Sequence, residues 1–124
     1  MIAKRLNPIL NVSDMQQSFA WFEKLGWKKE WDWDSPPTFG SVCSGECAIF
    51  LCLDGQGGRG NKAGLWMSIW VDDVDTIYQH CLKQGIEVTF PPTDMPWNTR
   101  EMHVRHPDGH VFRISKSMEE DEQR

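Results

Sequence analysis

NVSDMQQSFAWFEKLGW at residues 11–27 and WVDDVDTIYQHCLKQGI at residues 70–86 decide the fold, because the second stretch repeats the pattern of the first. Each stretch begins with the end of a strand and passes through an acidic turn. Each then continues with apolar residues at helical spacing and stops at a glycine. Matching positions lie 59 residues apart throughout. The sequence therefore predicts an internal duplication.

Two helices are expected, at residues 13–25 and 73–84. Both carry an apolar stripe at the spacing of one helix face, and a glycine directly follows each of them. Ser13 and Gln16 have the spacing of a capping box at the start of the first helix. The second helix begins with acidic residues, which favour a helix N-terminus.

Strand-like runs surround both helices. They cover residues 6–12, 27–33, 38–43 and 47–53 in the first half, and residues 65–71, 86–90, 100–106 and 110–115 in the second. The order is βαβββ, twice. We therefore expect an α+β fold of two βαβββ modules, with curved mixed sheets and the helices on their outer face.

One domain is expected over residues 1–118. Module one covers residues 1–54 and module two covers residues 65–118. The intervening linker, residues 55–64, is rich in glycine, and residues 119–124 form a charged tail.

Charge and hydropathy limit the possible partners. The formal net charge is −5, so the basic footprint of a general nucleic-acid binder is missing. The sequence contains no secretory h-region and no run of apolar residues long enough to span a membrane. We expect a soluble, cytoplasmic protein that binds neither nucleic acid nor membrane.

The four cysteines are Cys43, Cys47, Cys52 and Cys81. Without an export signal, they are most simply reduced and packed as small apolar side chains. A structural zinc site is the alternative. Their spacing contains no C-x2-C pair, which argues against zinc.

The last hairpin can be assigned a register. A three-residue turn at residues 107–109 pairs Val104 with Phe112 and collects the apolar residues on one face. His103 then lies across from Arg113. The opposite face holds Glu101, His103, Arg105, Val111 and Arg113. The histidines that flank the turn, His106 and His110, are expected to be exposed to solvent.

Alternation along the other strands leaves a second face that mixes rings with polar groups, which suits a ligand cup. Seven tryptophans and six phenylalanines provide more ring surface than a small core needs. The candidate ligand contacts are Asn7, Phe50, Cys52, Trp66, Ser68, Trp97, Glu101, His103 and Arg113. For Trp66 and Trp70, packing in the core is the alternative, and Trp97 follows a proline in a loop.

Glu101, His103 and Arg113 form a candidate catalytic trio. His103 is a possible general base, Glu101 would orient it, and Arg113 would hold an anion. The alternative is a structural ion pair across the strands. We favour the ion pair, because no nucleophile stands beside the histidine.

Two modules with this pattern, together with PWNTREMHVRHPDGHVFRIS at residues 96–115, resemble the vicinal-oxygen-chelate superfamily. That superfamily contains glyoxalase I, extradiol dioxygenases, fosfomycin-resistance enzymes and bleomycin-resistance proteins. The motif at residues 96–115 is most similar to the bleomycin-resistance branch. The resemblance implies a fold of the glyoxalase and bleomycin-resistance type.

Enzymes of this superfamily hold a divalent metal with one residue from the first strand and one from the last strand of each module. The resemblance places these four positions at Asn7, Phe50, Trp66 and Arg113. None of these side chains is a good ligand for a divalent cation. We therefore expect no metal, no other cofactor and none of the metal-dependent chemistries.

For the bleomycin-resistance branch, the resemblance implies a homodimer whose cups combine the first module of one chain with the second module of the other. The function expected here is sequestration of a planar, cationic small molecule in an aromatic-lined cup, as in antibiotic resistance. One alternative is an enzyme of the lyase, dioxygenase or transferase type that acts on a small oxygenated substrate. Another is an interaction module whose rings form the dimer interface.

Overall fold

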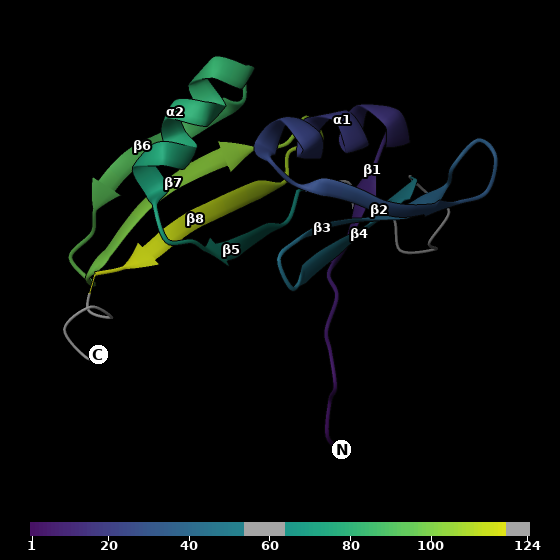
Figure 1. The fold of residues 1–124 in the computed structure, drawn as a ribbon, viewed down its shortest axis with the longest axis horizontal. Coiled ribbons are helices and arrows are strands. Elements are labelled where there is room, and N and C mark those ends of the chain that lie inside the picture. The colour runs from purple at the N-terminus through teal and green to yellow at the C-terminus, as the bar shows by residue number, and fades with distance from the viewer. Residues whose placement is uncertain (54–63, 119–124) are drawn as a thin grey trace. The chain divides into compact units, whose positions relative to one another are not determined.

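A computed structural model of the chain describes residues 1–53 and 64–118. It divides into two units, residues 1–63 and 64–124, and each has one helix and one four-stranded sheet (Figure 1). The predicted linker lies outside the described residues except for Gly64, and the predicted tail lies wholly outside them. Within the described residues, no helix is both long and apolar enough to cross a membrane.

The order of elements is βαβββ in both units. The first unit contains β1 (Ile9–Val12), α1 (Met15–Leu25), β2 (Lys28–Trp33), β3 (Phe39–Ser44) and β4 (Cys47–Leu53). The second contains β5 (Trp66–Trp70), α2 (Val74–Gln84), β6 (Glu87–Asp94), β7 (Thr99–Arg105) and β8 (Val111–Ser117). This confirms the predicted α+β fold and the duplicated module.

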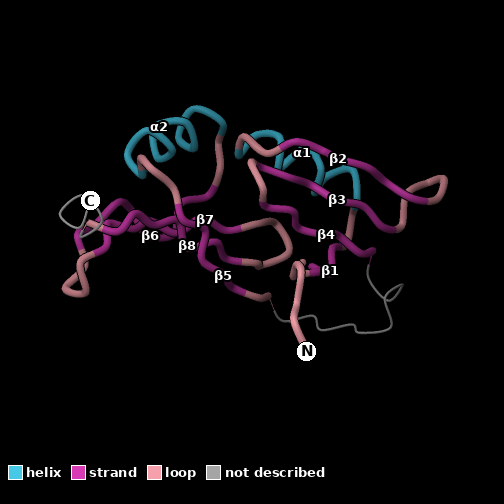
Figure 2. The backbone as a smooth tube through the Cα atoms, turned by 60° about the horizontal axis from the view of Figure 1, so that its bottom comes forward, coloured by secondary structure: helices cyan, strands magenta, loops and turns pink. Residues whose placement is uncertain are grey.

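The two sheets have the same topology. Their strand orders are β1-β4-β3-β2 and β5-β8-β7-β6. In each sheet the first and last strands of the unit pair in parallel, and the other neighbours are antiparallel. Each helix packs on one face of its own sheet, as the tube in Figure 2 shows. The other face of each sheet is therefore left without a helix.

Both helices begin at an aspartate cap. The side chain of Asp14 accepts a hydrogen bond from the Gln17 N–H, so the predicted Ser13 cap is wrong by one residue. Asp73 caps α2 in the same way. At the other end of α1, Gly26 has φ 107°, a left-handed conformation that a side chain would oppose.

Two edge regions differ from the sequence-based prediction. The first strand starts only at Ile9, and Leu6 is 85% exposed, because Pro8 has no N–H to extend the ladder. The strand β6 runs on to Asp94, four residues beyond the predicted end. It tolerates two prolines there because it lies at the edge of its sheet.

The core of each unit lies between the helix and the sheet. Trp21 and Trp27 are each only 8% exposed, in agreement with their assignment to helix packing. The fully buried apolar side chains include Leu10, Val12, Phe22, Val42 and Leu51 in the first unit, and Cys81, Met102, Val104 and Phe112 in the second. These residues follow the predicted strand alternation and helix stripes.

The turn between β7 and β8 has the predicted register. Val104 pairs with Phe112 and His103 pairs with Arg113, and Gly109 has φ 89°. The predicted exposure of His106 and His110 is wrong, since they are only 1% and 2% exposed.

Both imidazoles are buried, and each accepts a hydrogen bond from a backbone N–H group. The Nδ1 atom of His106 accepts a hydrogen bond from the Asp108 N–H at 3.0 Å. The Nδ1 atom of His110 accepts one from the Leu65 N–H, also at 3.0 Å. His106 therefore stabilises the turn, and His110 links the turn to the residue before β5.

Candidate functional site

The helix-free face of the second sheet gathers side chains from all four strands. His103 on β7 pairs with Arg113 on β8 and with Phe90 on β6. Arg113 also pairs with Ser68 on β5, and Ser68 shares its face with Trp66. Neighbours across the strands thus form a continuous row over this face.

Glu101 is the centre of the polar contacts on this face. Its side chain is only 3% exposed and accepts two hydrogen bonds from Arg113, at 2.8 Å from both Nε and Nη2. Trp97 Nε1 donates to it at 3.2 Å and Thr99 Oγ1 at 3.0 Å. His103 Nε2 lies 3.0 Å from Oε2. The carboxylate therefore fixes a strand pair and a loop tryptophan together.

These contacts set the charge state of the pair. Hydrogen bonds from Arg113 are the largest effect and lower the pKa of Glu101 to about 2, against the opposing effect of burial. The same pairing raises the pKa of Arg113. Glu101 is therefore a carboxylate and Arg113 a guanidinium at neutral pH, and their charges balance.

A hollow of about 550 Å³ opens above this pair. We call it the ring-lined hollow, and it is lined by Trp66, Phe90, Met95, Trp97, Glu101, His103 and Arg113. Trp66 is 69% exposed and Trp97 is 56% exposed, so neither ring is packed in a core of its unit. The guanidinium of Arg113 lies 5.9 Å from the centre of the Trp97 ring. Aromatic faces and a paired charge together suit a flat ligand.

Five of the nine predicted contacts meet at this hollow, namely Trp66, Trp97, Glu101, His103 and Arg113. The sequence prediction missed two lining residues. Phe90 is one, since strict alternation along its strand would place it on the same face as Val88. A β-bulge between these two residues turns Phe90 to the face of His103. Met95, the other, lies in a loop where no periodicity signals direction.

Ser68 and Trp70 lie on the same face but outside the hollow. Ser68 is exposed and pairs with Arg113. Trp70 is 60% exposed, so the core-packing alternative fails for this ring as well.

In the first unit, the predicted contacts divide between two environments. Asn7 and Phe50 line a smaller hollow of about 270 Å³, together with Arg5, Glu30, Trp31, Cys43, Gly45, Glu46, Cys47 and Ala48. Cys52 shares the face of Phe50 but is only 2% exposed, and its thiol donates to the Leu53 carbonyl at 3.6 Å. Cys52 therefore lines neither of these two hollows.

Rings dominate the helix-free face of the first unit. The ring centres of Trp31 and Phe50 lie 5.4 Å apart, and those of Phe39 and Phe50 lie 5.8 Å apart. Trp31 and Phe39 stack with an interplanar angle of 22°. The sequence prediction included Phe50 but not its two partners.

The four positions where the resemblance would place metal ligands carry side chains that do not suit a divalent cation. Asn7 donates its side-chain amide to the Ala48 carbonyl at 3.0 Å. Phe50 and Trp66 present rings, and Arg113 presents a positive charge. Within residues 1–53 and 64–118, no cluster of three or more His, Cys, Asp or Glu side chains is arranged to hold a metal.

The four cysteines are all free thiols. Cys52 and Cys81 are buried, Cys43 is half-buried and Cys47 is exposed. Burial raises the pKa of Cys81, which keeps this thiol protonated. Cys81 thus packs as an apolar side chain, as predicted.

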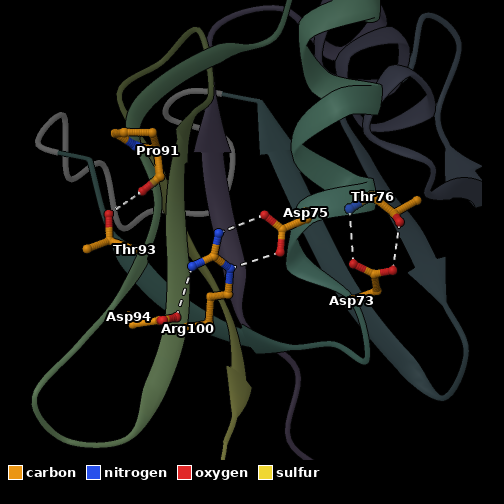
Figure 3. Close-up of polar contacts among 7 residues, drawn as sticks. All are labelled: Asp73, Asp75, Thr76, Pro91, Thr93, Asp94 and Arg100. Atoms are coloured by element: carbon orange, nitrogen blue, oxygen red, sulfur yellow. Dashed lines mark hydrogen bonds and ion pairs between the residues drawn. The ribbon is translucent and has the colours of Figure 1, made fainter.

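A third hollow, of about 400 Å³, lies beside the start of α2, and the ion pair of Arg100 and Asp75 forms part of its lining. Figure 3 shows Arg100 between Asp75 of α2 and Asp94 of β6. Arg100 makes two hydrogen bonds of 2.8 Å to Asp75 and one of 2.9 Å to Asp94. Its hydrogen bonds lower the pKa of Asp75. This network joins the helix to the edge strand.

Comparison with protein families gives one match that spans most of the chain. The model described as Glyoxalase/Bleomycin resistance protein/Dioxygenase superfamily matches residues 5–114. A search of curated proteins gave no match.

Solved structures show the same fold. TioX from Micromonospora sp. ML1 superposes with a TM-score of 0.83 at 18% identity, covering 92% of this chain and 98% of that one. The virulence protein STM3117 from Salmonella typhimurium gives 0.77 at 19%, covering 94% and 99%. A member of the same superfamily from Sphaerobacter thermophilus DSM 20745 gives 0.80 at 27%, covering 94% and 98%.

Proposed function

The chain belongs to the Glyoxalase/Bleomycin resistance protein/Dioxygenase superfamily, and from this membership and the ring-lined hollow we propose that it is a binding protein that sequesters a planar small molecule. The observation that carries the proposal is the arrangement of Trp66, Phe90 and Trp97 around a charge-balanced pair whose carboxylate is buried. Planar ligands stack on such rings. The misfit of the four metal-ligand positions supports binding in preference to metal-dependent catalysis.

The hollow has a prearranged polar floor. Glu101 holds Arg113 through two hydrogen bonds and Trp97 through one. A side chain that is already fixed loses little freedom when a ligand arrives, so less of the binding free energy is spent on ordering. This favours binding of a rigid, flat molecule.

The sequence suggested a cationic ligand because the net charge is −5. A net charge acts at long range and mainly speeds the approach of a cation. Inside the ring-lined hollow, Glu101 and Arg113 neutralise each other. The proposal therefore rests on stacking, and the overall charge supports only faster association with cations.

We also propose a homodimer, as the resemblance to bleomycin-resistance proteins implies. Large apolar side chains are exposed in both units, including Ile9 at 52%, Trp33 at 67% and Trp70 at 60%. Large apolar side chains favour an interface where they gather into a contiguous exposed patch. Analytical ultracentrifugation at micromolar protein tests this, and a single monomer species would remove the dimer.

Ligand binding is tested by titrating intrinsic tryptophan fluorescence with bleomycin. We expect saturable quenching, and a loss of at least about tenfold in affinity for Trp66→Ala, which corresponds to about 1.4 kcal/mol. Trp70→Ala is the matched control, since Trp70 lies on the same strand and face but outside the hollow. Absence of saturation at micromolar ligand would remove bleomycin as the ligand. Equal losses in the two variants would remove the hollow as its site.

An enzyme is the second candidate function, and one contact favours it. Glu101 Oε2 lies 3.0 Å from His103 Nε2, which is how a carboxylate orients a general base. His103 also lines the hollow. Turnover of a small oxygenated substrate that is lost in both His103→Ala and Glu101→Gln would support this alternative.

A further inference from the structure

The floor of the ring-lined hollow contains one guanidinium whose donors are only partly used. Arg113 directs Nε and Nη2 to Glu101. Its remaining terminal nitrogen, Nη1, makes no hydrogen bond to any residue that the structure describes. The Arg113 side chain is 24% exposed and lines the hollow. A strong donor is therefore within reach of a bound ligand.

The carboxylate of Glu101, also on the floor of the hollow, has no oxygen left for a hydrogen bond to a ligand. Oε1 of Glu101 accepts from Arg113, Trp97 and Thr99, and Oε2 contacts Arg113 and His103. A cation in the hollow would have to displace one of these partners to reach either oxygen, and the side chain is only 3% exposed. The negative charge of Glu101 is thus already paired with donors of the protein itself.

We propose that the ligand is a planar ring system with an oxygen acceptor at its edge, such as an aromatic carboxylate or carbonyl, and that Nη1 of Arg113 donates to this oxygen. The inference rests on the proposed function, because it names the polar group of the molecule bound in the same hollow. Hydrogen bonds from a guanidinium to a carboxylate are among the strongest that a side chain offers.

The positions of the rings also favour a ligand with an acceptor oxygen over a cationic ligand. The guanidinium of Arg113 lies 5.9 Å from the centre of the Trp97 ring, so a cationic ligand stacking there meets a like charge. Phe90 lies 4.8 Å from the His103 ring, and both line the hollow. The bidentate pair with Glu101 holds the Arg113 fork in one orientation, which favours one direction of approach for an acceptor.

Three matched naphthalenes test the inference by isothermal titration calorimetry. They share the ring and differ in the substituent, which is carboxylate in 2-naphthoate, amide in 2-naphthamide and ammonium in 2-naphthylmethylamine. We expect 2-naphthoate to bind at least about tenfold more tightly than the ammonium compound, with the amide between them. Equal or tighter binding of the ammonium compound overturns the inference.

A charge-neutral double variant locates the preference. Glu101→Gln with Arg113→Gln removes both charges at once, so no charge is left buried without its partner. We expect the ratio of naphthoate to ammonium affinity to fall to about one, because the donor that distinguishes the two substituents is gone. An unchanged ratio in a folded variant places the acceptor contact elsewhere and overturns the assignment to Arg113.

A salt titration tests the same contact in the wild-type protein, so the result does not depend on whether a variant folds. Raising NaCl from about 0.05 M to about 0.5 M should weaken 2-naphthoate binding at least about threefold and leave 2-naphthamide unchanged. Identical salt responses overturn the charged contact. If none of the three compounds binds, the planar-ligand function itself fails. If all three bind equally, only the acceptor inference fails.

Discussion

The helix-free faces of the two units place different side chains on one framework of positions. In the first unit, Phe39 and Phe50 are in ring contact at 5.8 Å. In the second, Glu101 and Arg113 form a bidentate ion pair at 2.8 Å. Both pairs join the third strand of the unit to the last strand.

The strand registers make these positions equivalent. Phe39 pairs with Cys52, two residues after Phe50, and Glu101 pairs with Ser115, two residues after Arg113. Trp31 of the first unit and Phe90 of the second are also equivalent. Trp31 pairs with Ser41 of β3, and Phe90 pairs with His103 of β7.

This comparison shows which part of a duplicated module is free to change. The face under the helix keeps an apolar core in both units, because burial there drives folding. The helix-free face accepts either a ring cluster or an ion pair, because no helix packs on it and requires apolar side chains there. The side-chain chemistry of the helix-free face can therefore diverge while the fold is retained.

Breaking the ion pair should have the largest effect. Glu101→Leu leaves Arg113 without its partner, and we expect a loss of about 3 to 5 kcal/mol in the free energy of unfolding. Urea denaturation measures it. The control is Glu87→Leu, an exposed glutamate on a neighbouring strand, with an expected change under about 0.5 kcal/mol. Equal stability of Glu101→Leu and wild type would contradict the central role of this carboxylate.

Converting the second face into the first sharpens the comparison further. In Glu101→Phe with Arg113→Phe, two rings replace the ion pair at the equivalent positions. We expect the double variant to recover to within about 1 kcal/mol of wild-type stability, because well-packed rings can substitute for a buried pair. A double variant no more stable than Glu101→Leu would show that the two faces are not interchangeable.

Acid should destabilise the second unit more than the first, because all four histidines lie in the second. Burial is the main cause that lowers the pKa of His106 to about 4 from its usual 6.5, and His110 adds to it. The unfolded chain therefore takes up this proton first, so the stabilisation is complete above pH 6.5 and is lost as the pH falls toward 4. We expect a loss of up to about 3 kcal/mol over this range.

Hydrogen exchange at pH 7, 5.5 and 4.5, followed by mass spectrometry, measures this loss separately for each unit. Protection should fall in the second unit before the first, and His106→Gln should remove most of the difference. A parallel loss of protection in both units would contradict the assignment to His106.

Removing a ring from the first face should have an intermediate effect. Phe50→Ala takes away the ring that contacts both Trp31 and Phe39, and Phe50 is half-buried. We expect a loss of about 2 kcal/mol, below the cost for a fully buried phenylalanine. Thermal unfolding checks it, with Phe50→Leu as the conservative control that loses less. A larger loss than in Glu101→Leu would reverse the ranking of the two faces.

The smallest effect is expected from Arg100→Gln. Its partners Asp75 and Asp94 are both more than half exposed, and exposed pairs add little to stability. The small loss should vanish in about 1 M salt, where the Debye length is about 3 Å. A loss that persists in high salt would indicate packing of the Arg100 stem and not its charge.

The regular parts of the fold were predictable because periodicity and turn chemistry determine them. The offset of 59 residues gave the duplication, and the turn at Gly109 gave the β7–β8 register. The burial of His106 and His110 was not predictable, because it depends on the backbone N–H groups of Asp108 and Leu65, which reach the imidazoles only in the folded chain.

Only part of the candidate site could be predicted from strand alternation. Glu101, His103 and Arg113 follow from the register of one hairpin. Phe90 does not, since a bulge breaks the alternation, and Cys52 was included although it is buried. Bulges and loop paths arise from edge geometry, which a sequence period does not encode.

The bulge before Phe90 also suggests how such a site can evolve. Val88 pairs with Val104 under the helix, while Phe90 pairs with His103 on the open face. Two residues of one strand thus span one step of its neighbour. An insertion at Thr89 would move a ring from the helix side of the sheet to its helix-free side without any substitution. Changes in the length of an edge strand can therefore change which side chains line this face, just as substitutions can.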